Sequence, residues 1–99
     1  MEASKVSRLN AVIHERARLG IMSLLAARPA LVFAEIKAYL ELTDGNLSVH
    51  LRILEEAGYV SIEKRFVDRK PRTTVKISRK GRIAFEHYVE VLEEIVKKR

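Results

Sequence analysis

Two groups of side chains in this 99-residue sequence carry chemistry suited to binding a polyanion. The first group lies in a predicted helix over residues 44–57, where the outward positions are polar, cationic or small. The second is a cationic run further along the chain, at Arg69, Lys70 and Arg72. Amide, hydroxyl and guanidinium groups donate hydrogen bonds to base edges and phosphates, so both groups favour nucleic-acid binding. The candidate contacts on the helix are Gly45, Asn46, Ser48, Val49, His50 and Arg52.

The distribution of charge supports the same interpretation. The net charge is +6, yet residues 1–60 contain seven basic and seven acidic residues. The excess lies in residues 61–82, which hold nine basic and two acidic residues. Because so concentrated a positive charge is typical of polyanion contact, double-stranded DNA is the predicted partner.

Catalytic and metal-binding chemistry finds no support in the sequence. There is no cysteine, the four glycines are dispersed, and no acid–base motif is recognisable. His87 and Glu90 alone have ligand spacing in the last predicted helix, which is too few for a metal site. The sequence therefore predicts a protein that is not an enzyme and has neither a cofactor nor a metal.

These groups must be positioned by the elements that the hydrophobic pattern predicts. Apolar residues at helical spacing predict helices over residues 9–27, 33–40 and 44–57. Alternating apolar and polar residues then predict a β-hairpin over residues 60–78, with a polar connection over residues 67–71. Ser78 is the predicted cap of a final helix over residues 79–97.

That order predicts an α+β, mainly helical fold, a winged helix-turn-helix with a two-stranded β-wing. We expect a single domain over residues 1–99, with an N-terminal tail over residues 1–8. The helix over residues 44–57 would be the recognition helix, because its apolar stripe can hold it on the domain while its polar side enters the major groove. The hairpin would lie on the DNA backbone or in the minor groove.

The final helix has an unusually wide apolar face, made of two neighbouring rows. One row would pack on the chain's own core, and the other would face a second copy of the chain. The sequence does not decide which row does which. The predicted dimer contacts are Ile13 from the first helix and Phe85, Val89, Leu92 and Val96 from the last.

Four stretches of the sequence resemble a known family. They are residues 14–19 (HERARL), 32–36 (VFAEI), 46–60 (NLSVHLRILEEAGYV) and 77–82 (ISRKGR). Together they are similar to the small winged-helix transcriptional regulators of bacteria and archaea, of MarR/ArsR-like type. The resemblance implies a homodimer that binds specific DNA sequences, usually as a repressor, through the third helix, with the terminal helices forming the dimer contact.

We therefore expect a cytoplasmic, homodimeric DNA-binding regulator with no membrane association, since no apolar run approaches the length of a membrane span. Two other functions remain open: an architectural DNA-binding protein without sequence preference, and a winged-helix module that binds other proteins. A regulator with a ligand pocket between the dimer halves is a weaker alternative. The sequence does not identify a small-molecule effector.

Overall fold

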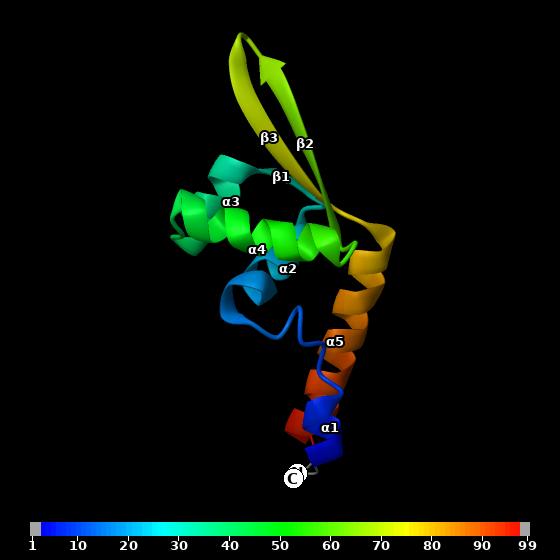
Figure 1. The fold of residues 1–99 in the computed structure, drawn as a ribbon. Coiled ribbons are helices and arrows are strands. Elements are labelled where there is room, and N and C mark those ends of the chain that lie inside the picture. Colours follow the sequence, from blue (N-terminus) through cyan, green and yellow to red (C-terminus); the bar gives the residue numbers. More distant parts are fainter. Residues whose placement is uncertain (1–2, 98–99) are drawn as a thin grey trace.

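The computed structural model describes residues 3–97, which form five helices and three strands (Figure 1). The molecule is elongated, about 55 × 25 × 21 Å, with a β-hairpin at one end and the long last helix extending toward the other (Figure 1). No helix in the described part of the chain is long and apolar enough to cross a membrane. The elements are α1 (Ala3–Ser7), α2 (Arg16–Ala27), β1 (Ala30–Val32), α3 (Phe33–Leu40), α4 (Asp44–Glu56), β2 (Val60–Val67), β3 (Lys70–Ile77) and α5 (Arg79–Lys97).

A single hydrophobic cluster holds the helices and the base of the sheet together. Each of α2, α3 and α4 contributes one apolar stripe to it, and Tyr88 brings in α5. Burying one such side chain stabilises the fold by about 1.5–3 kcal/mol. The fully or almost fully buried members are Ile13, Ile21, Met22, Leu25, Leu31, Ile36, Leu47, Leu51, Leu54, Val60, Val75 and Tyr88.

The predicted winged helix fold is confirmed, but the sheet has three strands rather than two. The third strand is β1, which pairs antiparallel with β3 and places Leu31 opposite Val75. The sequence did not predict this strand because three residues are too few to show an alternating pattern. This strand joins the start of α3 to the hairpin.

The first predicted helix, residues 9–27, begins later than expected, at Arg16. The Asn10 side chain accepts hydrogen bonds from the backbone N–H groups of Val12 and Ile13, at 2.9 and 3.1 Å, and so closes a separate turn. Glu15 then caps α2 through the N–H of Arg18. Residues 3–7 of the predicted tail form α1, which lies against α5.

The hairpin β2–β3, called the wing below, closes through a tighter turn than predicted. Val67 pairs with Lys70, so only Asp68 and Arg69 form the turn. Both have positive φ, 52° and 65°, as expected for the turn type that matches the twist of a hairpin. Each strand is consequently longer than the sequence pattern indicated, and the wing extends further from the core.

Helix α5 begins at a closely packed corner, where it meets the end of α4. The Ser78 hydroxyl accepts from the N–H of Gly81 at 2.9 Å, which confirms the predicted cap, and donates to the carbonyl of Gly58 at 2.6 Å. Gly58 ends α4 with φ of 81°. A Cβ at Gly81 would collide with the carbonyl oxygen of Tyr59, so the backbones touch there. This corner sets the direction in which α5 leaves the domain.

Candidate nucleic-acid interface

Helix α4 exposes the side that the sequence predicted to contact DNA. Leu47, Leu51 and Leu54 are buried and fix the helix on the core. Gly45 has no atom near the position of a Cβ, so a flat surface could approach its backbone closely. Asn46, Ser48, Val49 and Arg52 are exposed as well.

The N-terminal end of α4 has features that suit the binding of an anion. Thr43 caps the helix by accepting from the N–H of Asn46 at 3.1 Å. The one acidic residue of the first turn, Asp44, lies 2.8 Å from Lys37 Nζ on α3, which offsets its charge. The positive end of the helix dipole therefore lies beside exposed hydrogen-bond donors, and the nearby carboxylate of Asp44 is paired with Lys37.

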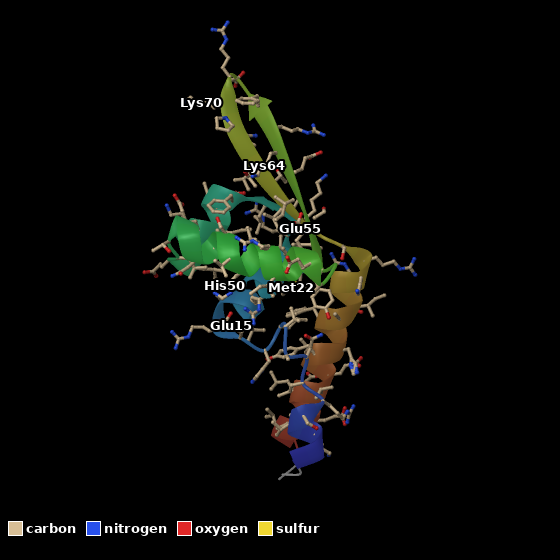
Figure 2. All side chains as sticks on the ribbon, in the orientation of Figure 1. Glu15, Met22, His50, Glu55, Lys64 and Lys70 are labelled. Carbon is tan, nitrogen blue, oxygen red and sulfur yellow. The ribbon has the colours of Figure 1, made fainter. Side chains whose placement is uncertain are left out.

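A groove of about 480 Å³ separates α4 from the wing. Ser48 and Arg52 line it from the helix, and Lys64 and Thr73 line it from the two strands of the wing. The helix side that carries the predicted contacts and one side of the wing thus face a common space. Figure 2 shows Lys64 on the wing beside α4 and Lys70 close to the wing tip.

The register of the wing determines which cations face this groove. Residues paired across antiparallel strands share a face, and successive pairs alternate. Because the Ile62–Val75 pair faces the core, Lys64 with Thr73 and Phe66 with Pro71 lie on the groove side. The predicted contacts Lys70 and Arg72 lie on the other face of the wing. Across the hairpin they pair with Val67 and Arg65. Arg69 is in the turn at the tip.

Lys64 is a candidate contact that the sequence reasoning missed. As an alternate residue of β2, it is on the same face of the strand as Val60 and Ile62. That face is core only at its base, however, and beyond Ile62 it continues into the groove. A count of the cross-strand residue pairs that the core can cover would have shown that Lys64 lies beyond the core.

Most cations of the candidate interface have no ion-pair partner in the described chain, although Asp44 and Glu55 also line the groove and Arg65 pairs with Glu63. Within residues 3–97, no carboxylate lies within ion-pair distance of Arg52 on α4, nor of Lys64, Arg69, Lys70 or Arg72 on the wing. All five are exposed. Unopposed cations on neighbouring surfaces attract a polyanion more strongly than paired ones do.

His50 does not lie with the other predicted contacts. Figure 2 shows it on the side of α4 away from the wing, next to Glu15. Its Nδ1 lies 3.0 Å from a guanidinium nitrogen of Arg18 and 3.6 Å from Glu15 Oε1. Arginine can only donate, so the ring nitrogen accepts this bond. His50 therefore links α4 to the start of α2, and we omit it from the interface.

This linkage predicts a modest acid sensitivity. Burial raises the pKa of Glu15, but hydrogen bonds from the backbone of Arg18 and Ala17, together with the charges of Arg18 and of the protonated form of His50, outweigh it, so the net pKa is lowered. A carboxyl whose pKa is lower in the folded state stabilises the fold above its unfolded pKa of ~4.3 and loses that contribution as the pH falls through the folded value.

We expect Glu15→Gln to lower stability at pH 7 by less than about 1 kcal/mol, because a third of the carboxylate side chain is exposed to screening solvent. The difference from wild type should shrink as the pH falls below the unfolded pKa and disappear once the carboxyl of the folded protein is protonated. Urea denaturation over a series of decreasing pH values measures this. Glu56→Gln, at an exposed glutamate outside the cap, is the control, and an equal loss for both variants would contradict the assignment.

The apolar surface on α5 is separate from the groove. Tyr88 and Val91 face the core, whereas Val89 and Val96 are 36 and 57 % exposed. Phe85 and Leu92 are partly buried at the edge of the core. The four predicted contacts Phe85, Val89, Leu92 and Val96 thus form the more exposed row. Ile13 is completely buried in its own chain, so it is not accessible to a partner.

Comparison with known proteins agrees with this fold. Residues 17–96 match a family described as "Winged helix DNA-binding domain". An uncharacterised protein of Methanocaldococcus jannaschii, MJ0432, is 42 % identical over 77 residues, which covers 77 % of this chain and 84 % of that protein. A solved transcriptional regulator homologue from Pyrococcus horikoshii OT3 superposes with a TM-score of 0.88 and 33 % identity over 94 % of both chains.

The chain belongs to the winged helix DNA-binding domain family. Its fold is also that of MarR, whose crystal structure superposes with a TM-score of 0.73 at 20 % identity, over 84 % of this chain and 60 % of MarR. The resemblance noted in the sequence is therefore confirmed at the level of family and fold. In residues 3–97, no cluster of three or more His, Asp or Glu side chains could hold a metal ion.

Proposed function

We propose that the protein is a homodimeric transcriptional regulator that binds specific DNA sequences, with α4 in the major groove and the wing on the adjacent minor groove. The observation that supports it most is the groove shared by Ser48 and Arg52 of α4 and Lys64 of the wing. Asn46, Ser48 and Arg52 would contact base edges. Val49 would meet a thymine methyl group, and Gly45 would permit close approach of the backbone.

The length of the wing fits this placement. From the Ile62–Val75 pair to the turn, β2 continues for five residues, or ~16 Å at ~3.3 Å per residue. Successive major grooves lie about 34 Å apart along one face of a duplex, so the minor groove between them is about 17 Å away. With α4 in a major groove, a wing of this length would reach the neighbouring minor groove.

The two faces of the wing would contact different DNA strands. A minor groove about 6 Å wide admits side chains but not a whole hairpin. Arg69, at the tip, would enter it. Lys64 on one face, and Lys70 and Arg72 on the other, would bind the phosphates along its two edges.

A second copy of the chain would pack against the exposed row of α5. Two-fold symmetry would then present two α4 helices to successive major grooves, about 34 Å apart. A protein bound in this way occludes a promoter, so we propose repression as the mode of regulation. Such a regulator acts where the chromosome is, in the cytoplasm of a bacterium or archaeon.

Selection of bound duplexes from a random pool, at 50 and 200 mM salt, tests the proposal. We expect a two-fold symmetric motif that is enriched at both salt concentrations, with binding weaker at the higher one. Binding without an enriched motif would indicate an architectural DNA-binding protein. No salt-sensitive binding at all would contradict a DNA-binding function and favour a protein-interaction module.

Variants separate sequence reading from backbone contact. Arg52→Ala or Asn46→Ala should reduce discrimination between the selected site and random DNA by about 1–3 kcal/mol per lost base contact. Arg69→Gly, which suits the positive φ of the turn, should weaken binding to all duplexes and reduce the salt slope by ~0.9. Fluorescence anisotropy titrations over a range of salt concentrations measure both quantities.

The control for lost charge is Lys97→Ala, at the end of α5 remote from the wing (Figure 1). It removes one cation, as Arg69→Gly does, but we expect the salt slope to be unchanged. Equal losses on specific and random DNA for the α4 variants would refute the proposed division between helix and wing.

A further inference from the structure

The tip of the wing carries an apolar residue that the fold does not use. Phe66 is 79 % exposed, the highest value among the large hydrophobic side chains of the described residues. It is on the groove side of the wing, four residue pairs beyond the Ile62–Val75 pair, which is the last pair on this face that packs on the core. A ring that remains in water contributes little to folding. Its exposure therefore indicates that it contacts a binding partner.

Phe66 has an apolar neighbour across the hairpin. In a two-residue hairpin the residues next to the turn form a hydrogen-bonded pair, so the following pair, Phe66 and Pro71, is of the non-hydrogen-bonded kind. Side chains of such pairs lie closest together, and Pro71 loses no ladder hydrogen bond there. The ring and the pyrrolidine therefore form one apolar edge beside Arg69.

The surroundings of this edge identify its partner. Arg69 and Lys70 adjoin it at the tip, and Lys64 precedes it on the same face. A hydrophobic protein surface or a second copy of this cationic hairpin would be a poor match for these charges. The exposed row of α5 is at the other end of the molecule (Figure 1). A partner that combines dense negative charge with stacked apolar faces is a nucleic-acid duplex.

We infer that Phe66, supported by Pro71, is a wedge that enters the minor groove, partly unstacks one base step and bends the duplex toward the major groove. The inference rests on the proposed DNA-binding function and adds to it. Phenylalanine and proline are among the side chains that wedge between base steps, and cations beside the wedge hold the phosphates of the kinked backbone. The step beneath Phe66 should be TA or CA/TG, because these unstack most easily.

The test uses a duplex of the selected site with fluorophores at its ends, and a second duplex with 2-aminopurine at the step beneath the wing. Energy transfer reports the bend, and 2-aminopurine fluorescence reports unstacking. We expect wild type to bend the duplex by roughly 20–90° and to raise the fluorescence. Phe66→Ala should leave the duplex almost straight, abolish the rise and weaken binding on the order of tenfold. Its salt slope should be unchanged, since no charge is removed.

Two further variants keep the test specific. Phe66→Leu retains an apolar wedge and should preserve much of the bend. Tyr39→Ala removes another exposed ring, from α3, and should bend DNA as wild type does. A wild-type protein that binds its site but leaves it straight, or a Phe66→Ala variant that bends it fully, overturns the wedge and leaves the proposed function intact. Absence of any duplex binding by wild type overturns both.

Discussion

Replacing Gly81 by alanine is expected to destabilise the fold by about 2–3 kcal/mol, although the change adds only a methyl group. The new Cβ would occupy the position of the Tyr59 carbonyl oxygen, which accepts a hydrogen bond from the N–H of Ser78 at 2.9 Å. Backbone cannot rotate away as a flexible side chain can. Helix α5 must therefore move, and the hydrogen bonds that hold its first turn on the end of α4 are strained or lost.

Thermal unfolding measures this effect, and for a domain of this size it should lower the Tm by roughly 10–20 °C. Gly45→Ala is the matched control. No atom lies within 4 Å of its new Cβ, and the residue is in the exposed first turn of α4. Its stability should equal or slightly exceed that of wild type, because alanine favours a helix more than glycine does. Similar Tm values for the two variants would mean that the contact at Tyr59 is unimportant.

Replacing Val89 by glutamate is expected to convert the protein into a monomer. Val89 is at the centre of the row that runs through Phe85, Leu92 and Val96, and it is already 36 % exposed in the single chain. The variant should therefore fold normally. In the proposed dimer the new carboxylate would lie in an apolar contact beside its own symmetry mate, and burying two unpaired like charges is highly unfavourable.

Loss of the dimer would also reduce DNA affinity, because each α4 would bind its half-site alone. The gain from joining two binding modules is commonly 10²–10⁴-fold, and a loss of about this size is expected on the complete site. Light scattering measures the mass, and anisotropy measures the affinity. His87→Glu adds the same charge about 200° around the helix and should stay dimeric. A monomeric wild type, or a dimeric Val89→Glu, would show that this row is not the interface.

The sequence predicted most of the elements because their patterns are long or clearly bounded. Helices α3 and α5 begin and end where expected, since their apolar spacing is regular and Ser78 caps the start of α5. The start of α2 was misplaced because Ile13 fits the helical spacing although it belongs to a separate turn. Only the hydrogen bonds of the Asn10 side chain distinguish the two cases, and periodicity does not contain them.

The sequence predicted which types of residue form the candidate interface, but not the direction in which each side chain points. The helical spacing correctly predicted that Ser48 and Arg52 point outward. His50 was grouped with them, but its contact with Arg18 holds it on the other side of the helix. On the wing, the composition of the loop drew attention to Lys70 and Arg72. The pairing register, which follows from the turn at Asp68 and Arg69, was needed to show that Lys64 faces the groove instead.

The short strand β1 has a mechanical consequence for regulation. It runs directly into α3 and is hydrogen-bonded to β3, so it ties the base of the wing to the helices that hold α4. The two parts of a protomer that would touch a duplex are therefore linked within the domain. In the proposed dimer, the angle at which α5 leaves the domain would set the distance between the two α4 helices, and a signal that changed this angle would change the fit to DNA.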